Sequence, residues 1–174
     1  TAVAQIHLDD PVKSPVTFII FKNTLVTVHY NELMSFSQYL VKAQKKNGVT
    51  IASPHALMLD ITESFINRIA DSLEALGSEM DRLSSDIFRS KKITIKRKTD
   101  TLQVAIRKVG AKGDLLSLMR ESLATIARMM SHHSLLISAP EHKGIKTKMT
   151  SLNRDVISLN DHAGFMANKM TFLL

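Results

Sequence analysis

The sequence predicts an α+β fold, in which a small partial β-sheet is followed by long antiparallel helices. Residues 16–30 are rich in β-branched and aromatic residues and contain the tight-turn signal Lys22-Asn23, a pattern typical of a β-hairpin. From residue 54 to the end of the chain, apolar residues recur in alternating steps of three and four. This is the spacing of amphipathic helices that pack along a seam.

The β part is expected to contain three strands, at residues 3–8, 16–21 and 25–30. Two or three strands are only marginally stable alone, so we expect helices or further strands to cover this sheet. Residues 32–46 predict one covering helix, which Asn47-Gly48 ends because Gly adopts the left-handed cap conformation. The side chains expected on its buried face are Leu33, Phe36, Leu40 and Ala43.

The first long helix is expected at residues 54–89, with Ser53 as N-cap and Pro54 at its first position. At about 1.5 Å per residue, the helix forms a rod of roughly 50 Å. Gly77 lies inside it and costs about 1 kcal/mol relative to Ala, so we expect Gly77 to mark a close helix crossing. The apolar seam of this helix consists of Ile66, Ile69, Leu73, Leu76, Met80, Leu83 and Ile87.

A basic linker through residue 98 is expected to lead into the second long helix. Thr99 or Asp100 is the expected N-cap. Gly110 and Gly113 interrupt the apolar pattern and predict a bend in this helix. Its seam consists of Leu102, Ile106, Val109, Leu116, Met119, Leu123, Ile126 and Met130.

A third long helix is expected from about Gly144, after a break at residues 138–140. Its apolar rhythm reaches the end of the chain without a closing Gly, Asn or Pro, so we expect the native helix to continue beyond Leu174. The first residue is not Met, and we expect trimming there too. The seam consists of Ile145, Met149, Leu152, Val156, Leu159, Ala163, Met166, Met170 and Leu173. The predicted parts are residues 1–53, the helical hairpin 54–143 and the terminal helix 144–174.

Composition excludes several functional classes. The 174 residues include no Cys and no Trp, which argues against disulfides, thiolate metal sites and an aromatic platform for nucleic acid. No apolar run approaches the roughly 20 residues of a membrane helix, and no basic n-region of a signal peptide is present. No nucleophile elbow or phosphate loop occurs, and no two of the seven His have the i, i+4 spacing of a helical metal site. We therefore expect no enzymatic activity and no cofactor.

Several segments together resemble the cytoplasmic part of CorA-type divalent cation transporters. Residues 57–74 and 80–88 resemble the long cytoplasmic helix of that family, and residues 16–28 resemble the hairpin that precedes its helices. Residues 123–128 resemble the return helix, and residues 154–174 resemble the stalk helix that enters the first membrane span. The resemblance covers nearly the whole chain, in the order and spacing of the family.

The resemblance implies a homopentamer in the inner (plasma) membrane of a bacterium, with this chain on the cytoplasmic side. It implies transport of Mg²⁺, Co²⁺ or Ni²⁺, or of zinc in one branch of the family. The family's two membrane helices are joined by a loop with a Gly-Met-Asn signature. This signature and both spans are absent from the 174 residues, so no pore residue is assigned. The implied partners are further copies of the chain, the membrane and divalent ions, and no nucleic acid.

The resemblance also carries a regulatory metal-binding role onto Asp60, with Glu63 one helical turn further on. The family senses intracellular Mg²⁺ at acidic sites between neighbouring protomers, and Asp60 matches an acidic position at the start of its long helix. Because Mg²⁺ keeps most of its water ligands, one or two carboxylates at a subunit boundary are chemically adequate. In the implied mechanism, bound Mg²⁺ keeps the pore shut, and its loss lets carboxylates repel and stalk helices loosen.

Two other interpretations follow from the residues. The helical seams also suit a coiled-coil scaffold that binds partner helices and has no transport role. The net charge of +7 and the basic cluster at residues 91–98 suit nucleic-acid binding, which predicts strongly salt-dependent affinity. A solvated linker is the commoner origin of such a charge run, and attraction to anionic lipid is a further alternative.

Overall fold

The computed structural model describes residues 2–5, 12–44, 52–89, 95–137 and 143–173. Within these residues it contains a three-stranded sheet and long helices, which confirms the predicted α+β fold. None of the described helices combines the length and the apolar content needed to cross a membrane. The elements are β1 (Ala2–Gln5), β2 (Val12–Phe21), β3 (Thr24–His29), α1 (Met34–Gln44), α2 (Pro54–Arg89), α3 (Ile95–Leu136) and α4 (Lys143–Leu173).

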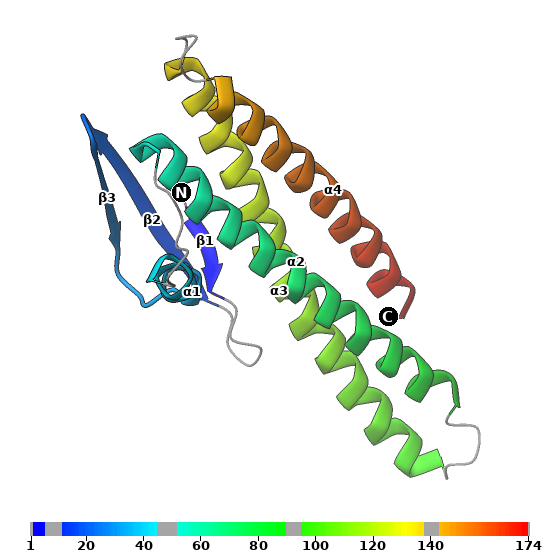
Figure 1. Ribbon diagram of the computed structural model, residues 1–174. Coiled ribbons are helices and arrows are strands. Elements are labelled where there is room, and N and C mark those ends of the chain that lie inside the picture. Colours follow the sequence, from blue (N-terminus) through cyan, green and yellow to red (C-terminus); the bar gives the residue numbers. More distant parts are fainter. Residues whose placement is uncertain (1, 6–11, 45–51, 90–94, 138–142, 174) are drawn as a thin grey trace.

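The helices α2 and α3 form an antiparallel hairpin that separates the sheet from α4 (Figure 1). The sheet and α1 pack on one side of this hairpin, and α4 runs along the other side in contact with both α2 and α3. The far end of the hairpin extends beyond the C-terminal end of α4 (Figure 1). The core therefore consists mainly of helix–helix contacts, and the sheet adds a third layer.

Strand β2 begins four residues earlier than the sequence predicted, at Val12 instead of residue 16. Its first four residues pair with β1 and the rest pairs with β3. Pro15 lies at the point where β2 changes partner, so its missing N–H falls at the end of one ladder, where a proline is tolerated. The expected first strand is confirmed within residues 2–5, and residues 6–8 lie outside the described residues.

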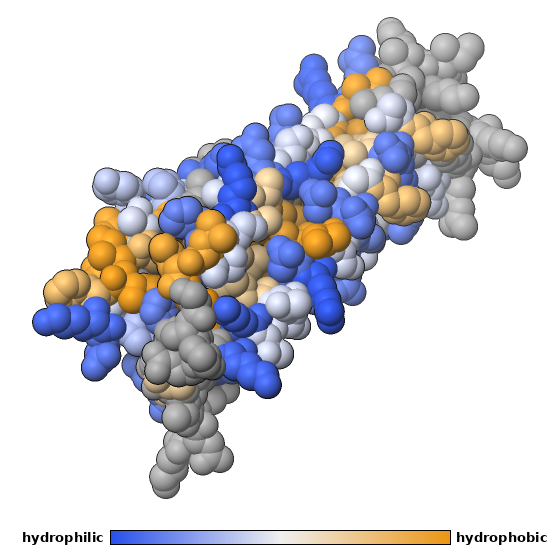
Figure 2. All heavy atoms as spheres, turned by 90° about the horizontal axis from the view of Figure 1, so that it is seen from above, coloured by the Kyte–Doolittle hydropathy of each residue, from blue (hydrophilic) through white to orange (hydrophobic). Residues whose placement is uncertain are grey.

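The predicted hairpin turn is confirmed, because Phe21 pairs with Thr24 across Lys22 and Asn23. Lys22 has a φ of 51°, a left-handed conformation that hairpin turns require and that side chains other than Gly and Asn adopt at a cost. On the inner face of β2, Val16 is fully buried, whereas on the outer face Phe21 is 67% exposed. Figure 2 shows apolar side chains gathered at the end of the molecule that carries the sheet.

Helix α1 presents a different face to the core from the predicted one. Leu33, just before the helix, is buried and Phe36 packs against the core, as expected, but Leu40 is 57% exposed. Tyr39 takes the buried position instead and is only 6% exposed. The prediction failed because it ranked side chains by apolarity alone, whereas Tyr39 buries its ring and keeps a polar partner for its hydroxyl.

Helix α2 agrees with the prediction. It begins at Pro54 and ends at Arg89, and the Ser53 hydroxyl accepts a hydrogen bond of 3.1 Å from the backbone N–H of Ala56, as an N-cap does. The seam residues Ile66, Ile69, Leu73, Leu76 and Met80 are all buried.

Helix α3 differs from the prediction in its start and in one seam residue. It begins at Ile95, so neither Thr99 nor Asp100 is its N-cap. Residues 96–98, expected in the linker, are helical because Lys and Arg are good helix formers. The helix is continuous through Gly110 and Gly113, and the bend expected there stays a prediction. Ile106, placed on the seam by its spacing, is 44% exposed. The other described seam residues are buried, namely Val109, Leu116, Met119, Leu123, Ile126 and Met130.

Helix α4 lies against the two glycines of the hairpin. A Cβ atom at Gly77 would lie 3.8 Å from Cε of Met166, and one at Gly113 would lie 3.4 Å from Sδ of Met170. Gly77 therefore lies where α2 contacts α4, and its neighbour there is the end of the Met166 side chain; the close helix crossing stays a prediction. An ion pair between Lys169 of α4 and Asp81 of α2 reinforces these contacts. Within the hairpin itself, Nζ of Lys112 on α3 lies 2.6 Å from Oε2 of Glu79 on α2.

Candidate functional site

Asp60 and Glu63 lie close together on α2 and share one partner from α4. Three residues apart on a helix, they lie on the same face. The Lys148 ammonium donates a hydrogen bond of 2.8 Å to Oε2 of Glu63 and a second bond to Oδ1 of Asp60. The Asp60 side chain is 19% exposed and that of Glu63 is 43% exposed. Both predicted metal ligands are thus bound to one lysine within the chain.

Asp60 also contacts α1. The Tyr39 hydroxyl donates a hydrogen bond of 3.3 Å to Oδ2 of Asp60. Asp60 therefore connects three helices, with Tyr39 on one of its oxygen atoms and Lys148 on the other. We call Tyr39, Asp60, Glu63 and Lys148 the lysine–carboxylate cluster.

The surroundings of the cluster shift two pKa values in the same direction. Burial raises the pKa of the Tyr39 hydroxyl, the adjacent Asp60 carboxylate raises it further, and Lys148 opposes these effects. Burial lowers the pKa of the Lys148 ammonium, but its hydrogen bonds to Asp60 and Glu63 outweigh this effect, so the pKa lies above its usual value. At neutral pH Tyr39 is therefore uncharged and Lys148 is positively charged.

These charges determine what the cluster can bind. Two carboxylates and one ammonium leave a net charge of −1, which attracts cations only weakly while Lys148 is in place. A divalent ion that binds directly to Asp60 has to compete with the lysine. Within the part of the chain that the structure describes, no three His, Asp or Glu side chains form a metal-binding group. The regulatory role of Asp60 and Glu63 stays a prediction.

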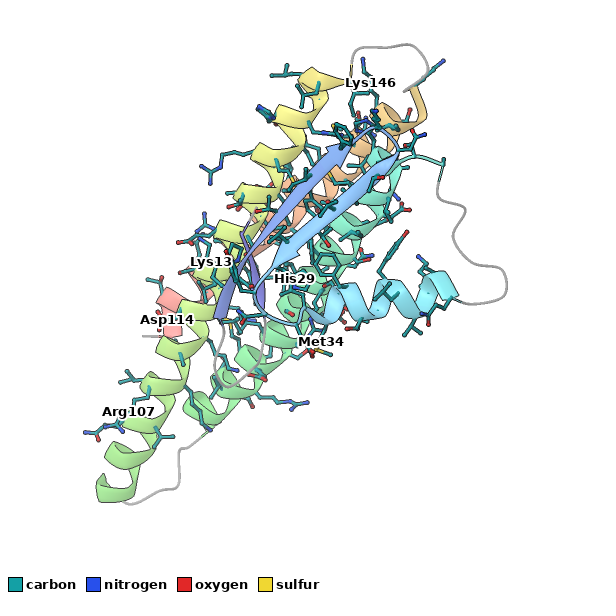
Figure 3. All side chains as sticks on the ribbon, turned by 90° about the vertical axis from the view of Figure 1, so that its left-hand side faces the viewer. Lys13, His29, Met34, Arg107, Asp114 and Lys146 are labelled. Atoms are coloured by element: carbon teal, nitrogen blue, oxygen red, sulfur yellow. The ribbon has the colours of Figure 1, made fainter. Side chains whose placement is uncertain are left out.

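Sequence reasoning missed Lys148 and Tyr39 as members of this cluster. Lys148 is 88 residues from Asp60 in the chain, and α4 carries several other lysines. Lys146, labelled in Figure 3 near the start of α4, is one of them. Only the way in which α4 docks on α2 distinguishes Lys148 from these lysines. The apolar rhythm of α1, which favoured Leu40, gave no signal for Tyr39.

A second polar contact joins the start of α2 to the end of α3. Nδ1 of His55 lies 3.1 Å from Nε2 of His133, and the ring centroids are 5.0 Å apart. His133 is 7% exposed, whereas its neighbour His132 is exposed. This confirms that His132 and His133 point to different faces of the helix. The sequence did not indicate the pairing of His55 with His133.

The architecture is that of an α+β domain whose small sheet rests on a long helical hairpin, with a terminal helix docked along the hairpin. A family model described as "CorA-like Mg2+ transporter protein" matches residues 4–173. The chain therefore belongs to this family, which confirms the resemblance seen in the sequence. The family is one of transporters, not of enzymes.

Individual relatives agree with this assignment. The chain is 26% identical over 161 residues to the magnesium transport protein CorA of Pectobacterium atrosepticum, and equally to that of Escherichia coli strain K12. In both cases the alignment covers 92% of this chain but only 48% of the relative. The chain thus spans about half the length of these relatives.

Solved structures share the fold. The complete CorA magnesium transporter from Methanocaldococcus jannaschii matches 99% of this chain with a TM-score of 0.79, and the match covers 51% of that protein. The separately solved soluble domain of the same transporter matches with a TM-score of 0.67, and the match covers 65% of that domain. Sequence identity is 15% in both comparisons, so these likenesses concern the fold alone.

Proposed function

We propose that this chain is the cytoplasmic part of a divalent cation transporter in a bacterial inner membrane, and that the full-length protein is a homopentamer that transports Mg²⁺, Co²⁺ or Ni²⁺. The observation that carries the proposal is the family match over residues 4–173. It is supported by relatives named as magnesium transport proteins and by a fold that matches the solved CorA magnesium transporter from Methanocaldococcus jannaschii over 99% of the chain. The terminal helix α4 takes the part of the stalk that leads to the membrane.

Transport by the full-length protein tests this proposal. The protein encoded by the whole gene is reconstituted into liposomes that contain a Mg²⁺-sensitive dye, and the dye signal is recorded after Mg²⁺ is added outside. We expect Mg²⁺ entry that exceeds entry into protein-free liposomes, with Co²⁺ and Ni²⁺ as further substrates. No entry of any of the three ions would contradict the proposal and would favour the helical scaffold instead.

We further propose that the lysine–carboxylate cluster takes part in regulation by intracellular Mg²⁺. Asp60 and Glu63 supply the hard oxygen ligands that Mg²⁺ prefers, while Lys148 neutralises one of their two charges and ties α4 to α2. In this proposal Mg²⁺ displaces the ammonium and bridges the two carboxylates to an acidic face of the neighbouring protomer, which holds the pore shut. Occupancy of the cluster is thereby linked to the position of the stalk helix.

The midpoint of thermal unfolding (Tm) of the detergent-solubilised full-length protein tests this second proposal. Millimolar Mg²⁺ is expected to raise the Tm, because an ion bound only to the folded state stabilises it. Asp60→Asn should remove this rise, and Lys148→Met should increase it because the competing cation is gone. Asp71→Asn, at an exposed acid on the same helix, is the matched control. The proposal fails if Asp60→Asn and Asp71→Asn respond to Mg²⁺ like the unmodified protein.

A further inference from the structure

The facing imidazole rings of His55 and His133 form a second potential ion site, which shares no residue with the lysine–carboxylate cluster. His55 lies in the first turn of α2, and His133 lies in the last turn of α3. The antiparallel hairpin brings these two helix ends together (Figure 1). The nitrogen atoms that face each other, Nδ1 of His55 and Nε2 of His133, are 3.1 Å apart. We propose that these two nitrogens bind a first-row transition-metal ion such as Zn²⁺ or Ni²⁺.

The nitrogen–nitrogen distance is close to the distance that such an ion requires. Zinc–imidazole bonds measure about 2.0–2.1 Å, and two such bonds at a tetrahedral angle place their nitrogens about 3.3 Å apart. The observed 3.1 Å is close to this value. Without metal, one of the two nitrogens donates its proton to the other. On binding, the ion takes the place of that proton, and the ring that carried the proton changes to its other neutral tautomer, with the proton on its second nitrogen.

The ligand type selects the class of ion. Imidazole nitrogen suits Zn²⁺, Ni²⁺ and Cu²⁺, whereas Mg²⁺ prefers oxygen ligands and retains its water. The His55–His133 pair therefore discriminates against Mg²⁺, unlike Asp60 and Glu63. This inference concerns a different ion and different residues, and it does not rest on the proposed function.

The surroundings leave room for the remaining ligands. The pair lines a surface hollow of about 640 Å³, whose wall also includes Phe18, Ile20 and the exposed His132. Two protein ligands leave two or more coordination positions for water, and an open hollow supplies that water. Arg128 is the nearby cation that opposes metal binding. Its guanidinium is directed towards its own helix, where it donates a hydrogen bond of 3.5 Å to the Thr125 hydroxyl.

Binding at this site would link the two ends of the hairpin. His55 and His133 are 78 residues apart in the chain, so the two nitrogens meet only when α2 and α3 are packed. An ion that needs both ligands binds the folded state in preference to the unfolded chain and stabilises it. The site therefore gives the hairpin a response to transition-metal ions that Mg²⁺ does not elicit.

Calorimetric titration of the 174-residue chain, without an affinity tag, tests the proposal with Zn²⁺ as the probe at neutral pH. We expect a binding event that survives a large excess of Mg²⁺. Removing either ligand should weaken it about tenfold or more, since even loss of a group that only orients a ligand costs about 10–100-fold. The variants are His55→Gln and His133→Gln. His162→Gln, at an exposed histidine of α4, is the matched control and should bind as the unmodified chain does.

A second measurement avoids substitution, because His133 is buried and its variant can lose stability. Paramagnetic Ni²⁺ broadens the NMR signals of nuclei near the ion, and we expect the amides around residues 55 and 133 to broaden first in the unmodified chain. The proposal is overturned if broadening begins elsewhere, if Mg²⁺ competes equally with Zn²⁺, or if His55→Gln retains unmodified affinity.

Discussion

Met166 of α4 lies directly over Gly77 of α2, so that a Cβ atom at Gly77 would meet Cε of Met166 at 3.8 Å. This distance is an ordinary van der Waals contact, so there is space for a methyl group but not for a larger side chain. One turn further along α4, Sδ of Met170 would lie 3.4 Å from a Cβ atom added at Gly113 of α3, which is a tighter fit. The two methionines therefore cover the two glycines where the terminal helix contacts the hairpin.

Substituting the glycines tests this packing. We expect Gly110→Ala to stabilise the chain by about 0.5–1 kcal/mol, because Ala favours the helix and nothing lies within 4 Å of the added atom. Gly77→Ala should give a similar or slightly smaller gain. Gly77→Leu should destabilise by about 1–3 kcal/mol, because it forces Met166 away. Urea unfolding measures all three; a stabilising Gly77→Leu would contradict the assigned contact.

Phe65 connects the sheet and α1 to the helical hairpin. It is 1% exposed, and its ring meets Phe36 edge to face at a centroid distance of 5.5 Å. Phe36 in turn stacks on His29, with their ring centroids 4.7 Å apart.

We expect Phe65→Ala to lower the free energy of unfolding by about 3–5 kcal/mol through loss of burial and an unfilled cavity. Phe165→Ala, at a side chain that is 63% exposed, is the control and should change stability by less than about 0.5 kcal/mol. Equal effects in urea unfolding would contradict the described core.

Lys148 fastens α4 to α2 through two carboxylates. We expect Lys148→Met to destabilise the chain by about 1 kcal/mol, because a partly exposed ion pair contributes modestly and its loss leaves two like charges together. Lys146→Met changes an exposed lysine of the same helix and should leave the free energy of unfolding nearly unchanged. Thermal unfolding at low and high salt measures both variants. An unaltered Tm for Lys148→Met would show that the cluster contributes nothing to docking.

The raised pKa values of Tyr39 and Lys148 predict alkaline sensitivity. In both cases the folded chain holds the proton more tightly than the unfolded chain. The stabilisation of the folded chain by these two groups is therefore fully present below about pH 10, and it is lost as the pH rises through their pKa values in the folded chain. We expect the combined variant Tyr39→Phe, Lys148→Met to lose less stability than the unmodified chain between about pH 8 and about pH 11. The urea midpoint as a function of pH measures this; parallel curves would contradict the assigned shifts.

Much of the fold follows from local patterns in the sequence. The three-and-four spacing located α2 and α4 to within about one residue and identified most of their buried side chains, because burial of one helical face imposes that period. The turn at Lys22 and the N-cap at Ser53 were also predictable, since each depends on neighbouring residues alone. The start of β2 was misplaced because the prediction relied on the β-branched and aromatic run that begins at residue 16, whereas residues 12–15 join the strand by pairing with β1.

The candidate site shows the limit of such reasoning. The sequence by itself determined the helical character, the seams, the family resemblance and the choice of Asp60 and Glu63 as acids on one face of a helix. Only the tertiary structure decided that Lys148 binds both carboxylates, that Tyr39 rather than Leu40 is buried, and that His55 meets His133. The physical reason is that periodicity shows which face of a helix is buried, whereas the identity of its partner depends on how distant helices dock. That docking is the sum of many weak contacts spread over the whole chain.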